Sequence, residues 1–102
     1  MKKSRLFIAL LASMPAPTLA QDLRQGKVLA IRWCATCHIV EARAEAGRAD
    51  GTPSFPAIAA WDKTTAQSLK ASMTAKHGQM PNFSLTNAEE ADLAAYILSL
   101  RR

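Results

Sequence analysis

The sequence predicts an all-α fold in one domain. Apolar residues recur at the three-to-four spacing of a helix face near both ends of 21–102. No segment alternates apolar and polar residues as a half-buried strand does. Two capping sequences, Thr64-x-x-Gln67 and Thr86-x-x-Glu89, mark the starts of further helices. The chain contains no internal repeat, so we expect a single helical domain over 21–102.

Residues 1–20 have the pattern of a secretory signal peptide. A basic start at 2–5 precedes an apolar stretch at 6–14, and small residues follow up to Ala20. The alternative, a membrane anchor, would need about 20 apolar residues, and this stretch is much shorter. We therefore expect cleavage after Ala20, or alternatively after Ala16, with export to the periplasm and no stable membrane insertion.

Charge and cysteine content narrow the functional classes. The formal net charge is +5, but the leader carries three cations and no carboxylate, so 21–102 has a net charge of only +2. No basic run interleaved with aromatic residues remains, and we expect no nucleic-acid partner. Two cysteines are too few for a disulfide framework, so a domain this small is expected to complete its core with a large apolar cofactor.

The first helix of the domain is predicted to begin at Asp22, whose side chain can cap its free N–H groups. One face carries residues three or four apart, with both cysteines near its end: Leu23, Gly26, Ala30, Trp33, Cys34 and Cys37. A polar loop follows from 41 to 51, and the prolines at 53 and 56 favour extended or turn backbone.

Two helical segments are predicted in the middle of the domain. A short turn covers 56–61, and a helix with Leu69 on its apolar face opens at Thr64 and ends at His77-Gly78.

A loop and a final helix complete the predicted domain. The segment 79–85 carries Met80 and includes a proline, an asparagine and a serine, so it is predicted to be a loop. The last helix opens at Thr86, with apolar residues on one face and two arginines suited to its negative end: Leu93, Tyr96, Ile97, Leu100, Arg101 and Arg102.

The motif Cys34-Ala35-Thr36-Cys37-His38 is the part of the chain that carries chemistry. Two thiols at this spacing can reach two vinyl groups of one porphyrin, and the adjoining histidine can meet the iron from the same side. The second ring nitrogen should donate to a backbone carbonyl that fixes the imidazole. The sequence thus predicts one haem c attached through Cys34 and Cys37, with His38 as an iron ligand.

Three other interpretations of the motif remain open from the residues. A thioredoxin-like dithiol would use the same cysteines but expects alternating strands and helices, and it does not require His38. A zinc site needs four ligands, and His77 is the only other histidine. A plain disulfide is compatible with export but gives no reason for His38.

The sixth iron ligand has three candidates. Met73 lies four residues after Leu69 on a predicted helix face, where methionine is more often a core residue. His77 ends that helix and is more often a solvated histidine. Met80 precedes Pro81 in a loop, where a thioether can be held in one place, and it is the favoured ligand.

These features resemble the class I cytochrome c family in its short bacterial form, over nearly all of 21–102. In that family a glycine lies eight residues before the first cysteine, as Gly26 does, and it lets the first helix approach an aromatic residue of the last helix, here Tyr96. Pro53 corresponds to the proline whose carbonyl accepts from the proximal histidine. Met80-Pro81 corresponds to the distal ligand. One departure is Ala30, where the family usually has an aromatic residue, with Trp33 nearby instead.

Other aromatic residues are candidates for haem contacts. Trp61 is either a packing residue or a donor to a haem propionate. Phe83 and Leu85 are either packing residues or a roof over the haem on the methionine side.

Both axial positions would be filled by His38 and Met80, so the predicted function is one-electron transfer rather than catalysis, with a relatively high potential. The protein would carry electrons between redox proteins, as a monomer or as the haem c subunit of an oxidoreductase complex. The alternative is a ligand-binding or peroxidase-like haem module with a displaceable Met80. Four lysines either steer an acidic partner or are simply solvated: Lys27, Lys63, Lys70 and Lys76.

Overall fold

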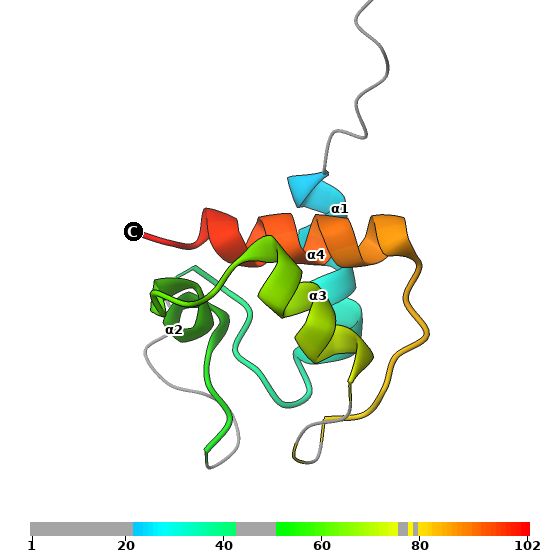
Figure 1. The fold of residues 1–102 in the computed structure, drawn as a ribbon, viewed down its shortest axis with the longest axis horizontal. Coiled ribbons are helices and arrows are strands. Elements are labelled where there is room, and N and C mark those ends of the chain that lie inside the picture. Colours follow the sequence, from blue (N-terminus) through cyan, green and yellow to red (C-terminus); the bar gives the residue numbers. More distant parts are fainter. Residues whose placement is uncertain (1–21, 43–50, 76–77, 79) are drawn as a thin grey trace, which may run out of the picture.

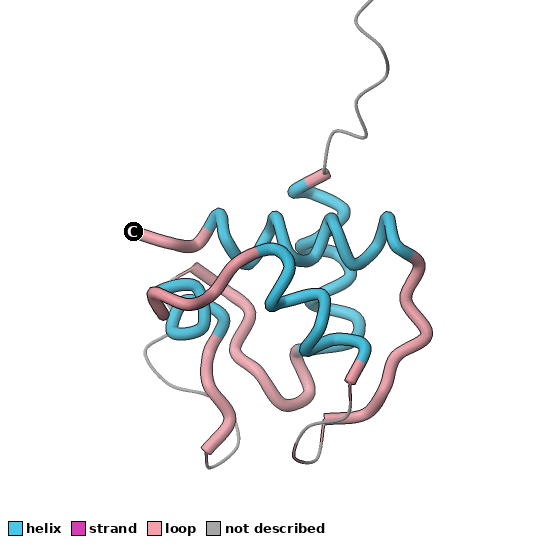
Figure 2. The backbone as a smooth tube through the Cα atoms, in the orientation of Figure 1, coloured by secondary structure: helices cyan, strands magenta, loops and turns pink. Residues whose placement is uncertain are grey.

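The computed structural model describes residues 22–42, 51–75, 78 and 80–102. These residues form four α-helices and one π-helical turn, and no strand occurs among them, which confirms the all-α prediction (Figure 1). The connections between the helices are irregular loops (Figure 2). No helix in the described part of the chain is long and apolar enough to cross a bilayer. The predicted leader 1–20 lies outside these residues.

The first helix is interrupted before the cysteines. α1 covers Leu23–Leu29, and Asp22 caps it by accepting from the backbone N–H groups of Arg24 and Gln25. A π-helical turn, η1, then covers Ala30–Cys34, so the prediction of one continuous helix to Cys37 is wrong. The wider turn is closed by a hydrogen bond from the Ala35 N–H to the Ala30 carbonyl, five residues back, at 3.0 Å.

α2 covers Phe55–Ala60, and its start is set by Ser54, whose hydroxyl accepts from the Ala57 N–H at 3.2 Å. The helix begins one residue earlier than predicted and ends before Trp61. Pro56 occupies the first turn, where a missing N–H costs nothing.

α3 covers Ala66–Thr74, and its capping box is formed by Thr65 and Ser68, not by Thr64 and Gln67 as predicted. Thr64 is buried, and its hydroxyl instead donates to the Ile58 carbonyl at 2.7 Å. This tertiary contact moves the cap by one residue. The helix ends before the predicted His77, which lies outside the described residues.

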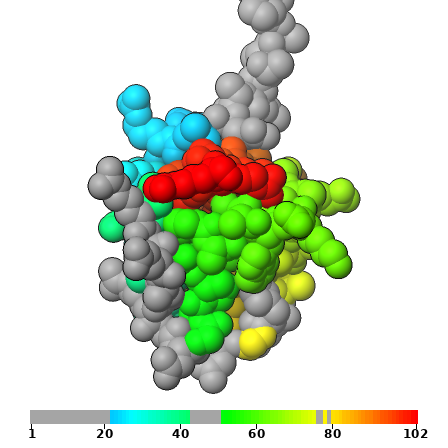
Figure 3. Space-filling model, turned by 90° about the vertical axis from the view of Figure 1, so that its left-hand side faces the viewer, coloured from blue at the N-terminus to red at the C-terminus, as the bar shows by residue number. Residues whose placement is uncertain are grey.

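α4 covers Asn87–Ser99, and its predicted capping box of Thr86 and Glu89 is confirmed. Arg101 does not serve the end of this helix as predicted. Its guanidinium donates to the carbonyls of Ala59 and Thr64, at 2.7 Å each, and so satisfies carbonyls at and beyond the end of α2. The C-terminal residues therefore lie beside the α2 region, as the red and green surfaces show (Figure 3).

The core forms where α1 crosses α4 (Figure 1). A Cβ added to Gly26 would overlap the Asp92 backbone carbonyl and would lie 2.8 Å from the Tyr96 Cβ. The close approach predicted for Gly26 and Tyr96 is thus confirmed. Among the described residues, eleven apolar side chains are buried around this crossing and within α2 and α3: Leu29, Ala30, Val40, Phe55, Ala59, Leu69, Met73, Leu93, Ala94, Tyr96 and Ile97.

Candidate haem site

The cysteine motif follows η1 as a compact turn. The Cys34 carbonyl accepts from the N–H groups of both Cys37 and His38, at 3.1 and 2.9 Å. The wider η1 turn places Cys34 half-buried against the core and leaves Trp33 at 43% exposure. The backbone thus brings the two cysteines and the histidine of the motif into one local unit.

Residues 38–40, which we call the His38 segment, lie beside the start of α2 and are bonded to it at residues 38 and 39. His38 Nδ1 lies 2.6 Å from the Pro53 carbonyl oxygen. Because a carbonyl can only accept, Nδ1 carries the proton, and Nε2 is left as the nitrogen with a free lone pair. One residue on, the Phe55 N–H, which has no partner within its own helix, donates to the Ile39 carbonyl at 2.9 Å.

α4 holds the same segment from the other side. The Tyr96 hydroxyl donates to the Val40 carbonyl at 2.6 Å in a buried hydrogen bond. The Phe55 ring lies between the two functional rings, with its centroid 5.4 Å from that of His38 and 6.5 Å from that of Tyr96. Each residue of the His38 segment therefore has one hydrogen bond to the scaffold, and the imidazole has an aromatic neighbour.

The state of the cysteines bears on the dithiol and disulfide interpretations. Both thiols are free, with Cys34 half-buried and Cys37 exposed. Burial raises the pKa of the Cys34 thiol to about 11. A redox dithiol works through a thiolate whose pKa is lowered, so this environment is opposite to the one that a thioredoxin-like site needs.

The zinc interpretation also lacks support in the described part of the chain. No group of three or more His, Cys, Asp or Glu side chains comes together there. The other histidine of the sequence, His77, lies outside the described residues, as does Lys76.

The two candidate methionines occupy different environments. Met73 is a buried core residue of α3, and Leu69, one helical turn earlier, is buried as well. Met80 is half-buried in the loop before α4 and packs against the core cluster, as Cys34 does. The loop thioether and the attachment cysteine are thus both placed at the edge of the same core.

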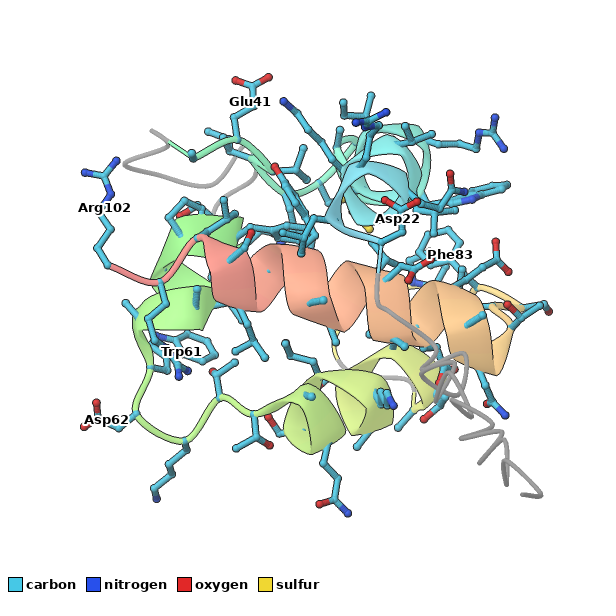
Figure 4. The ribbon with its side chains drawn as sticks, turned by 90° about the horizontal axis from the view of Figure 1, so that it is seen from above. Asp22, Glu41, Trp61, Asp62, Phe83 and Arg102 are labelled. Carbon is cyan, nitrogen blue, oxygen red and sulfur yellow. The ribbon has the colours of Figure 1, made fainter. Side chains whose placement is uncertain are left out.

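The aromatic candidates are separated in space. Phe83 is half-buried, and its ring centroid lies 5.7 Å from that of Trp33, at an interplanar angle of 47°. Trp61 is 56% exposed between α2 and α3. Seen from above, Trp61 and Phe83 lie toward opposite ends of α4 (Figure 4). Leu85 packs against the core.

These observations fit a covalently bound haem. The imidazole is oriented by a carbonyl at Nδ1 and keeps Nε2 for a metal, which is the arrangement that histidine ligands usually show. The thiol spacing suits two porphyrin attachments, and Met80 carries a thioether in a separate loop. The helical fold and this donor set define a c-type cytochrome.

Comparison with known proteins agrees with this class. Residues 21–97 match the family described as cytochrome c oxidase, cbb3-type, subunit III. The chain is also 40% identical over 90 residues to cytochrome c-552 of Bradyrhizobium diazoefficiens, which covers 88% of this chain and 86% of that relative. No solved structure matches. The chain belongs to this cytochrome c family, and it is a haem c electron carrier rather than an enzyme.

Several supporting residues were not predicted from the sequence. The hydrogen bond of Tyr96 to Val40, the ring of Phe55 beside His38 and the bridge from Phe55 to Ile39 all join segments far apart in the chain. Only the Ser54-x-x-Ala57 start of α2, next to the predicted Pro53 acceptor, carried a local sign that this helix end lies at the site.

Proposed function

We propose that this protein carries one electron at a time through a haem attached to Cys34 and Cys37, with His38 and Met80 as the two iron ligands. The observation that carries the proposal is the 2.6 Å contact of His38 Nδ1 with the Pro53 carbonyl, which leaves Nε2 to bind iron. The haem would supply Fe(III)/Fe(II) cycling at a potential raised by the methionine sulfur.

The surrounding residues would keep the ligand set fixed during electron transfer. The carbonyl of Pro53 orients the imidazole, and the bonds from Phe55 and Tyr96 fix the backbone that follows it. A site held in one geometry needs little reorganisation when its charge changes. With both iron positions filled by side chains, no position is left for a substrate.

The test combines mass spectrometry with a ligand probe. Denaturing mass spectrometry of the purified protein should show the mass of one covalent haem, and Cys34→Ala or Cys37→Ala should reduce its attachment. Carbon monoxide added to the reduced protein should bind slowly. Rapid binding of one equivalent would instead favour a ligand-binding or peroxidase-like module with a displaceable Met80.

The methionine ligand is tested by a matched pair of variants. Met80→Ala should abolish the sulfur-to-iron charge-transfer band of the oxidised protein. Met73→Leu, a volume-conserving change in the core, should leave the band intact. The opposite result would move the ligand assignment to Met73.

Two aromatic residues, Phe83 and Trp61, and the nearby Leu85 are proposed as haem contacts. Phe83 and Leu85, half-buried after Met80, would cover the methionine side. Trp61, more than half exposed, would donate its indole N–H to a propionate at the haem edge. Trp61→Phe keeps a ring and removes the N–H, so it should shift the reduction potential; an unchanged potential would leave Trp61 as a packing residue.

Export and partners belong to the same proposal. Residues 1–20 would be removed as a leader, and 21–102 would work in the periplasm between redox proteins, alone or within an oxidoreductase complex. N-terminal sequencing of protein recovered from the periplasm should begin at Gln21. The exposed Lys27 and Lys63 would help to attract an acidic partner, and raised salt should then slow electron transfer.

A further inference from the structure

Residues 80–85, which we call the Met80 segment, contact the rest of the described structure through three side chains. The segment lies outside the helices, Met80 takes part in an isolated backbone bridge, and the Leu85 N–H donates to the Phe83 carbonyl at 2.8 Å. Met80 and Leu85 pack against the core at its two ends. Between these ends, Phe83 makes a ring contact with Trp33 of η1.

Trp33 is placed unusually for so large a side chain. It directly precedes Cys34, which packs against the core, yet it is itself 43% exposed. Its ring meets Phe83 at 5.7 Å in a tilted arrangement, within the range of favourable aromatic pairs. The contact therefore joins the helix that ends at the attachment cysteine to the loop that carries the methionine.

We infer that Trp33 is a positioning residue that holds the Met80 segment closed through Phe83 and so keeps the thioether on the iron. The inference rests on the proposed function, because it takes Met80 as the ligand. It also gives a role to the aromatic residue at position 33, since position 30, where the family usually has an aromatic residue, is a fully buried alanine here.

The expected effect follows from the usual strength of an aromatic pair. A ligand that enters from solvent must wait for the Met80 segment to open, so its binding rate follows the open fraction. Removing the ring contact should raise that fraction about two- to tenfold. The covalent attachment of haem to the cysteines should not change.

The experiment uses the exported haem protein and three variants. Trp33→Ala should bind carbon monoxide about two- to tenfold faster in the reduced state. When the pH is raised or denaturant is added, its charge-transfer band should also disappear at a lower pH or at a lower denaturant concentration than the band of the wild type. Trp33→Phe, which keeps a ring, should restore most of both properties. Ile31→Ala, an exposed apolar change on the same turn, should match the wild type.

A double-mutant cycle separates the contact from any direct effect of Phe83 on the haem. If the two rings act together, Phe83→Ala should accelerate binding little more when Trp33 is already alanine. Independent effects that multiply would overturn the inference, as would a Trp33→Ala protein with wild-type band and binding rate.

Failure of the proposed function would look different. A wild-type protein that has covalent haem but no charge-transfer band, and that binds carbon monoxide at once, would show that Met80 is not the ligand. That result would overturn both the ligand assignment and the role of Trp33. An intact wild-type band with an unaffected Trp33→Ala protein would overturn only the latter.

Discussion

The His38 segment and the Met80 segment are held in different ways. The first has a hydrogen bond at each of its three residues, to Pro53, Phe55 and Tyr96. The contacts of the second with the other described residues are packing contacts, including that of Phe83 with Trp33, and the Leu85 N–H donates within the segment to the Phe83 carbonyl. Directional bonds to a helix end and a buried hydroxyl fix one geometry, whereas packing allows a segment to open and close.

This difference separates two kinds of consequence. Changes at the anchors of the His38 segment should lower the global stability, because these anchors belong to the core. Changes at the contact of the Met80 segment should alter ligand exchange with little effect on unfolding.

The largest effect is expected at Gly26. Gly26→Ala places a Cβ against the Asp92 carbonyl and the Tyr96 Cβ, which forces α1 and α4 apart. We expect a loss of about 3 kcal/mol in the free energy of unfolding, measured with denaturant. Gly51→Ala is the control, because its Cβ meets nothing but its φ of 78° is strained, so about 1 kcal/mol is expected. Equal losses would argue against a tight crossing.

The next effect is expected at the Tyr96 hydroxyl. Tyr96→Phe leaves the buried Val40 carbonyl without its partner and should cost about 2 kcal/mol in denaturant unfolding. Gln67→Ala, an exposed change on α3, is the control and should change stability by less than about 0.5 kcal/mol. A Tyr96→Phe protein as stable as the wild type would show that this anchor contributes nothing.

The α2 cap should contribute about half as much. Ser54→Ala removes the hydroxyl that accepts from Ala57 and should cost about 1 kcal/mol. Thr65→Ala removes the cap of α3 and should cost about the same. Only Ser54→Ala should shift the reduction potential, because Ser54 lies between Pro53 and Phe55, two of the three residues that hold the His38 segment. Equal shifts of the reduction potential in both variants would show that the α2 cap has no specific effect on the haem site.

The Met80 segment should show a smaller effect on unfolding. Trp33→Ala is expected to lower the free energy of unfolding by at most about 1 kcal/mol, since the ring is partly exposed and its partner lies in a loop. Thermal unfolding followed by far-ultraviolet circular dichroism measures it. A loss as large as that of Tyr96→Phe would erase the distinction between the two segments.

The smallest expected change is a pH dependence. Burial, and then the negative charge of Glu41, raise the pKa of Tyr96 above its usual value. Because the unfolded chain then loses this proton first, stability should fall as the pH rises from about 10 through the folded-state pKa. Denaturant unfolding at pH 9 and 11 measures the fall, and Tyr96→Phe should show less of it. An equal fall in both proteins would assign it to other groups.

Local signals gave the correct sequence-based predictions. The cysteine motif and the Thr86 capping box depend on neighbouring residues, whereas the role of Gly26 was implied by the resemblance to the class I cytochrome c family. The Pro53 carbonyl accepts from His38, as predicted. The first residue of α2, Phe55, bonds to the neighbouring Ile39 and so keeps Pro53 beside the histidine.

The wrong or missing predictions depended on contacts that residue spacing does not reveal. Thr64 resembles a cap, but it donates to Ile58 instead, so the cap is Thr65. The π-helical turn differs from an α-helix by one extra residue, which the apolar spacing did not reveal, and the pairing of Trp33 with Phe83 joins residues fifty positions apart.

The contact of α1 with α4 has a consequence for how the protein is made. The first helix of the domain packs on the last, and Arg101, next to the chain end, completes the corner after α2. The core therefore cannot close on a partly synthesised chain. Until α4 has been made, the helix before the cysteines has no partner to pack on, and the segment with both cysteines stays outside a closed core.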